Sequence, residues 1–346
     1  AVAEAPANQE PLIPTALHRA APTSSALQRR RPMDQFHDRH HVRLRSRALG
    51  GYLHAADDGE SVVLRRGRAS LNAAWAVHLR PGGGRGVHLL LHSAAYGRYL
   101  AANTTAPAPP GHRCSRAEQR DYDHPVVPDI MWEAIRAGSQ GDVLLRTVGG
   151  HYLRANGRYR RWKTGVSVDG DYITTMARWA VERIPRREGA PALPPPIPIR
   201  VQGRLSGIIF GRQEREAWRT IRFFTENGFS QGLYPENGWH EFPFLGRSVF
   251  HLSEELNIRV GVLNGRPAPR LRHVVPSFGV EDLPDGFVMC VRAGRHGRLT
   301  PLVVDLPRGG DGETLEIIVA LSGTQVYHEL RHPDVDARRE RSEQES

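Results

Sequence analysis

The sequence predicts a mainly β protein with two consecutive domains, a β-trefoil of three repeats and a C-terminal ubiquitin-like α+β (β-grasp) domain. A short phrase built on glycine, tyrosine and leucine occurs three times in the first half of the chain, and a tryptophan follows each occurrence. In the second half, two strand-like stretches precede a helix-like stretch and three more strands. The length of 346 residues suits two domains of ordinary size.

The repeated phrase reads Gly51-Tyr52-Leu53, then Gly97-Arg98-Tyr99-Leu100, then Gly150-His151-Tyr152-Leu153. Because the same residue types return at similar spacing, we interpret them as packing positions and not as ligand platforms. The glycine before each tyrosine marks a hairpin turn, where a positive φ is free of strain. The predicted repeat core consists of the tyrosine, leucine and tryptophan of each unit: Tyr52, Leu53, Trp75, Tyr99, Leu100, Trp132, Tyr152, Leu153 and Trp179.

Each repeat contains four predicted strands. The first alternates apolar and polar residues, as at Val42 and Leu44, which is the period of a half-buried strand. The second carries the tyrosine and leucine, the third is valine-rich as at 62–64 and 166–168, and the fourth begins with the tryptophan. Four strands repeated three times predict a closed barrel capped by three hairpins over residues 33–184. Closure removes the sheet edges that would otherwise invite aggregation.

The second domain is predicted over residues 217–322. Alternating apolar residues indicate strands around Ile221 and Phe242, and Val249, Leu252, Leu256 and Val260 share one face of a helix over 248–260. Gly261 is expected to cap that helix at its C-terminus. Further strands are predicted at 287–291, 302–306 and 315–321. Two strands, a helix and further strands favour a ubiquitin-like roll.

Three segments lie outside the two domains. Residues 1–32 are rich in alanine, proline and arginine without an apolar period, so we expect them to be disordered or to belong to upstream sequence. Residues 185–216 form a proline-rich linker that favours an extended conformation. Residues 323–346 are expected to be a charged, frayed tail.

The repeat region is similar to the β-trefoil of fascin and other actin-cross-linking proteins, and residues 33–322 resemble a plant-specific family known only as a domain of unknown function. Val42-Arg43-Leu44-Arg45-Ser46 and Gly51-Tyr52-Leu53 carry this resemblance in the first domain. In the second domain it rests on Trp239-His240-Glu241-Phe242, on 246–252 and on 289–295. The resemblance implies a trefoil followed by a ubiquitin-like domain and an actin-cross-linking-like character. It supplies no catalytic residues.

The basic composition of the chain is compatible with an anionic partner but does not establish one. The formal net charge is +10, and its excess lies on the repeat region and the linker, but Lys163 is the single lysine among 47 basic residues. Such a bias towards arginine is typical of a GC-rich coding sequence as well as of anion binding.

Cys114 and Cys290 match no metal or redox spacing, so we expect reduced thiols. We find no signal peptide and no membrane span in the sequence, and expect a cytoplasmic or nuclear protein without cofactor or metal.

The most suggestive binding stretch lies in the third repeat. Four cations interleave with two aromatic rings there, a composition that suits an anionic polymer, and the residues are Arg158, Tyr159, Arg160, Arg161, Trp162 and Lys163. The alternative is a solvated hairpin in which the tryptophan packs on the trefoil and the arginine stems cover apolar surface.

Other motifs are weaker. His37, His40 and His41 fit no structural zinc spacing, and Gly82–Gly86 lacks the residues of a phosphate-binding loop. Gly309-Gly310 lies between two predicted strands, so we do not expect a conjugation tail. No catalytic motif stands out, and we predict a non-enzymatic interaction protein.

Its partner is expected to be a protein, with actin filaments as one candidate. The alternative is a polyanion or nucleic acid bound by the basic trefoil face. One trefoil offers one filament site, so we expect weak bundling by a monomer. The sequence leaves the oligomeric state open.

Overall fold

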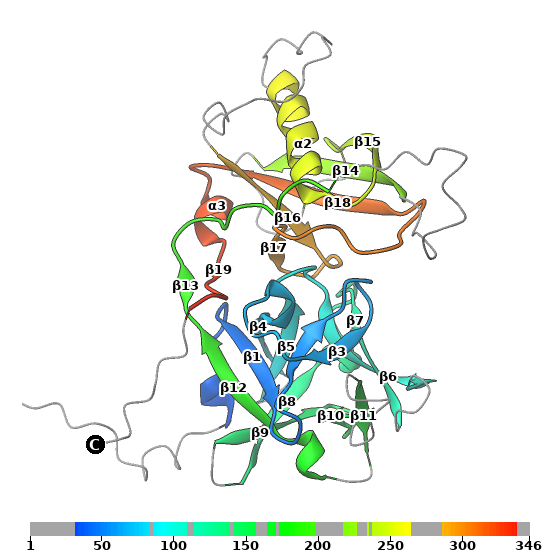
Figure 1. The fold of residues 1–346 in the computed structure, drawn as a ribbon, viewed down its shortest axis with the longest axis vertical. Coiled ribbons are helices and arrows are strands. Elements are labelled where there is room, and N and C mark those ends of the chain that lie inside the picture. Colours follow the sequence, from blue (N-terminus) through cyan, green and yellow to red (C-terminus); the bar gives the residue numbers. More distant parts are fainter. Residues whose placement is uncertain are drawn as a thin grey trace, which may run out of the picture. The chain divides into compact units, whose positions relative to one another are not determined.

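The computed structural model describes most of the chain (Figure 1). The described residues are 32–82, 86–108, 114–138, 141–156, 165–170, 173–197, 217–226, 234, 237–263 and 286–337. The predicted N-terminal extension, except for Pro32, therefore lies outside them, as does the linker from residue 198 onwards. Residues 31–346 form one compact unit that contains both predicted domains.

Each repeat of the first domain contributes four strands. They are β1 (His41–Ser46), β2 (Tyr52–Ala55), β3 (Val62–Arg65) and β4 (Trp75–Pro81); β5 (Val87–Ser93), β6 (Tyr99–Pro107), β7 (Ser115–Arg120) and β8 (Trp132–Ala137); and β9 (Asp142–Thr147), β10 (Tyr152–Ala155), β11 (Val166–Asp169) and β12 (Trp179–Ile184). The first and fourth strands of the three repeats pair in a ring, β1-β4-β5-β8-β9-β12, which closes because β12 pairs with β1. The second and third strands form three hairpins, and bridges such as Ser61 to Glu118 join one hairpin to the next. The predicted trefoil is confirmed.

A short 3₁₀ turn precedes the tryptophan strand of every repeat, a feature that we did not predict. The turns are η2 (Leu71–Ala73), η3 (Pro128–Ile130) and η4 (Thr175–Ala177), and a fourth, η1 (Pro32–Gln35), precedes β1. The hydroxyls of Ser70 and Thr174 accept backbone N–H groups at the start of η2 and η4, while η3 begins with a proline. These turns return the chain to the barrel wall.

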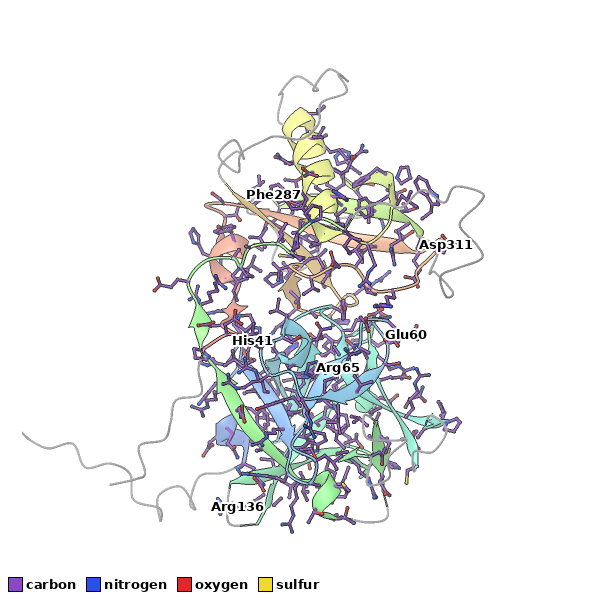
Figure 2. The ribbon with its side chains drawn as sticks, viewed as in Figure 1. His41, Glu60, Arg65, Arg136, Phe287 and Asp311 are labelled. Carbon is purple, nitrogen blue, oxygen red and sulfur yellow. The ribbon has the colours of Figure 1, made fainter. Side chains whose placement is uncertain are left out.

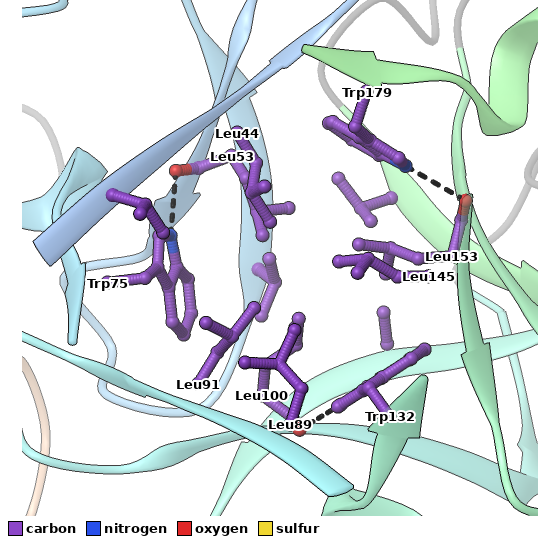
Figure 3. Close-up of a cluster of buried hydrophobic side chains, with 14 of the residues drawn as sticks. Leu44, Leu53, Trp75, Leu89, Leu91, Leu100, Trp132, Leu145, Leu153 and Trp179 are labelled. Carbon is purple, nitrogen blue, oxygen red and sulfur yellow. Dashed lines mark hydrogen bonds between the residues drawn. The ribbon is translucent and has the colours of Figure 1, made fainter. Parts of the chain in front are cut away.

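The core of the trefoil is built from the predicted leucines and tryptophans (Figure 3). All three tryptophan side chains are fully buried. Each indole N–H donates a hydrogen bond to the leucine carbonyl of its own repeat: Trp75 to Leu53 at 3.0 Å, Trp132 to Leu100 at 2.9 Å and Trp179 to Leu153 at 3.0 Å. The same bond at three equivalent places satisfies a polar group that burial would otherwise penalise.

Tyr52 and Tyr99 are buried as predicted and Tyr152 is only partly buried, but none of the three repeated tyrosines packs in the barrel core. Successive residues of a strand point to opposite faces, so the leucine faces inwards and the tyrosine before it faces outwards. The hydroxyl of Tyr52 contacts Glu182 at 3.3 Å, Tyr99 lies fully buried in a separate cluster, and Tyr152 packs beside Leu144. One repeated residue thus has three different environments.

The turn glycines also need a correction. A positive φ occurs at Gly50, Gly97 and Gly150, each two positions before a tyrosine, and not at Gly51. The αL conformation that the hairpin needs is therefore supplied one residue earlier than we predicted in the first repeat.

The second domain is an α+β roll. Its strands are β14 (Trp218–Glu226), β15 (His240–Leu245), β16 (Phe287–Arg292), β17 (Leu299–Pro301) and β18 (Thr314–Leu321), in the sheet order β15-β14-β18-β16-β17. The first strand, β14, runs parallel to the last, β18, and the other neighbours are antiparallel. Helix α2 (Val249–Leu263) covers one face of the sheet and packs Leu252 and Leu256 against it. This arrangement confirms the β-grasp prediction.

Several details of the second domain differ from our expectation. Helix α2 continues to Leu263, and Gly261 lies inside it without the positive φ of a C-terminal cap. The fourth strand is Leu299–Pro301 and not 302–306, where Leu302 and Leu306 fill the core from irregular backbone. The carboxylate of Asp305 in that stretch accepts the Val249 N–H at the start of α2.

The expected frayed tail has defined structure up to residue 337. It contains α3 (Gln325–Glu329) and β19 (His332–Pro333), and β19 pairs with β13 (Arg186–Arg187) at the start of the predicted linker. Arg43, a fully buried residue of β1, donates a hydrogen bond to the Val335 carbonyl at 2.7 Å. The tail thus supplies an acceptor to one nitrogen of this buried guanidinium, whose Nη1 has no hydrogen-bond partner among the described residues.

Candidate functional site between the two domains

The predicted cationic stretch lies outside the described residues. It comprises Arg158, Tyr159, Arg160, Arg161, Trp162 and Lys163. The described residues instead point to the junction between the trefoil and the ubiquitin-like domain. That junction was not predicted, because it joins positions far apart in the sequence.

The turn between β16 and β17 forms backbone hydrogen bonds with the second repeat of the trefoil. The Tyr122 N–H donates to the Ala293 carbonyl at 2.9 Å, and the His296 N–H donates to the Tyr122 carbonyl at 2.8 Å. Gly294 has a φ of +81°, and a Cβ atom there would lie 2.5 Å from the carbonyl carbon of Tyr122. Only glycine permits so close an approach of two backbones.

Arg298 follows this turn and ties the two domains together by side chain and backbone. Its guanidinium donates two hydrogen bonds to the Asp38 carboxylate, at 2.9 and 3.0 Å, and its N–H donates to the Tyr99 hydroxyl at 3.0 Å. Burial raises the pKa of Asp38, but hydrogen bonds from Arg298 and the Leu79 amide, with the nearby positive charge, bring the net pKa below its usual value. The carboxylate is therefore ionised at neutral pH.

A cavity of about 700 Å³ opens beside this junction. Residues from both domains and from the tail line it, and its charged and titratable lining includes Arg39, His41, His92, Arg298, Glu329 and Arg331. Figure 2 labels His41, which begins β1. The volume lies within the range of sites for small molecules or for single groups of a larger partner. Arginines outnumber the one carboxylate of the lining, so the cavity favours an anion.

The imidazole of His41, which is only 8% exposed, and the guanidinium of Arg331 are among the lining side chains without a hydrogen-bond partner in the described part of the chain. Burial, with the charges of His332, His40 and Arg331, lowers the pKa of His41 to about 3. His41 is thus neutral at pH 7 and offers the cavity one N–H donor.

A second cavity, of about 620 Å³, lies between the first repeat and the segment around Asp305. Its buried polar groups already have partners. His54 Nε2 lies 2.8 Å from the Gly67 carbonyl, and the Asn72 amide donates to the Ala55 carbonyl at 2.9 Å. Its buried polar groups are therefore less available to a ligand than those of the first cavity.

The structure separates the histidines that we considered for a metal. The rings of His37 and His40 lie 5.4 Å apart, whereas His41 lines the cavity and Asp38 pairs with Arg298. Among the described residues, no group of three or more metal-ligating side chains is found. Cys114 is exposed and Cys290 is buried, and burial raises the pKa of the Cys290 thiol.

The buried histidines predict acid sensitivity. Burial lowers the pKa of His41 to about 3 and that of His78 to about 4, against about 6.5 in an unfolded chain. Below pH 6.5 the unfolded state binds protons that the folded state excludes, so stability is full above that pH and falls as the pH drops towards 4, by at most about 1.4 kcal/mol per pH unit for each histidine. Urea unfolding at pH 7.5 and 5.5 measures this loss, and H78Q should reduce it. Equal stability at both pH values would contradict the prediction.

Comparisons with known proteins agree with the architecture. Residues 33–182 match the family model of a β-trefoil domain of unknown function, DUF569, and residues 217–320 match that of the DUF569-associated ubiquitin-like domain. No curated protein matches the chain. Among the described residues, no helix has the length and apolar composition needed to cross a membrane.

Several solved structures are similar to part of the chain. The SDF2-like protein from Arabidopsis thaliana is 18% identical, with 42% of this chain and 94% of that chain covered and a TM-score of 0.37. A Caenorhabditis elegans protein with unknown function is 20% identical, with 43% and 97% covered and a TM-score of 0.36. The ricin B-like lectin of Macrolepiota procera, in complex with lactose, is 16% identical, with 42% and 97% covered and a TM-score of 0.33.

Proposed function

Since this chain belongs to the DUF569 family, with the β-trefoil and its associated ubiquitin-like domain in that order, we propose that it is a non-enzymatic binding protein. Its ligand is an anionic group of a protein partner, and its site is the cavity between the two domains. Actin filaments are one candidate partner, named because of the resemblance of the repeats to actin-cross-linking trefoils.

The observation that carries this proposal is the charge of the cavity lining. Arg39, Arg298 and Arg331 face the same space as Glu329, and Arg331 has no ion pair within the described parts of the chain. A positively charged cavity with low-dielectric walls attracts an anion more strongly than an open surface does. Guanidinium groups also match the geometry of carboxylate and phosphate oxygens.

Both domains support such a role by holding the cavity in shape. The Arg298–Asp38 pair and the contacts of Gly294 fix one wall, and the pairing of β13 with β19 fixes the tail that forms another. A preformed site loses less entropy when a ligand binds.

The second candidate is polyanion or nucleic-acid binding by the stretch Arg158 to Lys163, which the sequence alone favours. Its aromatic rings and cations suit stacking and backbone contacts along a polymer. Such binding would weaken steeply as salt rises.

One titration distinguishes the two sites. We expect a fluorescein-labelled oligoglutamate to bind the full chain, and the double variant R39A/R331A to bind about tenfold more weakly, because charge-assisted hydrogen bonds are lost. The charge-matched double variant R66A/R183A should bind as the unmodified chain does, since neither residue lines the cavity. If the triple variant R160A/R161A/K163A loses binding and R39A/R331A does not, the cavity proposal is wrong.

A further inference from the structure

The donors around the cavity come from separate elements of the fold. Arg39 lies between η1 and β1, His41 begins β1, and Arg331 lies between α3 and β19. Arg39 and Arg331, which are 292 positions apart in the sequence, therefore line the same cavity. A ligand that engages all of them needs acceptor atoms in several directions.

A carboxylate is satisfied by fewer donors than this site offers. At the edge of the same cavity, one guanidinium, that of Arg298, already binds both oxygens of Asp38. A phosphate monoester instead has three terminal oxygens, each a strong acceptor, and carries about −1.5 to −2 charges at neutral pH. It can accept from two guanidinium groups and an imidazole N–H together.

In the described structure, Glu329 binds one of the donors that would otherwise be open to a ligand, the guanidinium of Arg39. Its carboxylate accepts from Arg39 at 3.2 Å, and both side chains are about half exposed, at 46% and 49%. Exposed ion pairs contribute little free energy, so an anionic ligand can displace this one at small cost.

The backbone of Arg39 supports a role beyond packing. Arg39 has a φ of +64°, the left-handed region that glycine adopts without strain and arginine does not. Residues held in such conformations cluster at functional sites, where the side chain offsets the cost by its role. A purely structural requirement at this turn would favour glycine.

We propose that the cavity binds a phosphate monoester through Arg39, His41 and Arg331, and that the ligand takes the place of Glu329 on Arg39. This inference rests on the proposed function and names the chemical class of its anionic group. The phosphate belongs to a phosphorylated side chain of a partner or to a small molecule, and the same residues would hold either.

The test is calorimetric titration of the full chain with inorganic phosphate and, separately, with a short phosphoserine peptide. We expect R39G and R331A each to weaken both ligands about tenfold, E329Q to strengthen them several-fold, and R66A to change nothing. R39G should also unfold at no lower urea concentration than the unmodified chain, because glycine relieves the strain at this turn. Tighter binding of the peptide would favour a phosphorylated side chain of a partner as the source, and equal binding would show that the site contacts the phosphate group alone.

Three outcomes would overturn the inference. If oligoglutamate binds the cavity and phosphate does not compete with it, the proposed function stands and the phosphate assignment falls. If R39G and R331A bind phosphate normally, the site lies elsewhere. If neither phosphate nor oligoglutamate binds, both proposals fall together.

Discussion

Replacing Trp132 with alanine should lower the free energy of unfolding by about 3–5 kcal/mol, the usual cost of deleting a large buried aromatic side chain. Trp132 is fully buried in the barrel, where it packs with the repeat leucines. Its removal leaves a cavity. It also removes the hydrogen bond that the indole N–H donates to the Leu100 carbonyl at 2.9 Å. Urea denaturation followed by circular dichroism measures the loss.

The matched control is Trp218, a tryptophan of the second domain that is 56% exposed. W218A should cost less, because more than half of its surface is already exposed to solvent. W75A and W179A should cost about as much as W132A, since the three indoles make the same bond in equivalent places. A loss below about 1 kcal/mol for W132A would show that the barrel core is not packed as described.

Replacing Gly294 with alanine should separate the two domains. The added Cβ would lie 2.5 Å from the carbonyl carbon of Tyr122 and 2.7 Å from its nitrogen, and backbone atoms cannot move aside as a flexible side chain can. The two backbone hydrogen bonds between this turn and Tyr122 would break. We expect scanning calorimetry to show one transition for the unmodified chain and two for the variant, and binding of oligoglutamate in the cavity should be lost with the junction.

Gly323 provides the control for this substitution. Its φ is +83°, close to that of Gly294, but a Cβ atom there would meet no atom within 4 Å. G323A therefore tests the backbone conformation alone, which costs about 1–2 kcal/mol. If G294A and G323A behave alike, the close approach to Tyr122 does not hold the domains together.

The sequence predicted the architecture because local periodicity encodes it. Alternating apolar residues such as Val42 and Leu44 define strands, and the triplicated leucine and tryptophan, as at Leu53 and Trp75, define the repeats. In the second domain the helical spacing of Leu252 and Leu256 identified α2. The strand and helix patterns lie within a few residues of chain, and the repeat is visible because the same residue types return about every 50 residues.

Other features depended on contacts that no local pattern records. The repeated tyrosines look equivalent in the sequence, but Tyr99 alone meets the second domain, through the backbone of Arg298. The tail reads as a charged segment until Val335 is seen to accept from buried Arg43. The binding stretch that the sequence favoured, 158–163, lies outside the described residues and stays a prediction.

The sequence by itself determined two domains, their order, and the leucines and tryptophans of the barrel core. The tertiary structure alone decided the cavity, since it brings Arg39 and His41 beside Arg331, near the opposite end of the chain. The physical reason is the distance along the chain over which each interaction acts. Strand and helix patterns arise from steric and hydrophobic preferences of neighbouring residues, whereas a site between domains exists only after both have folded and docked.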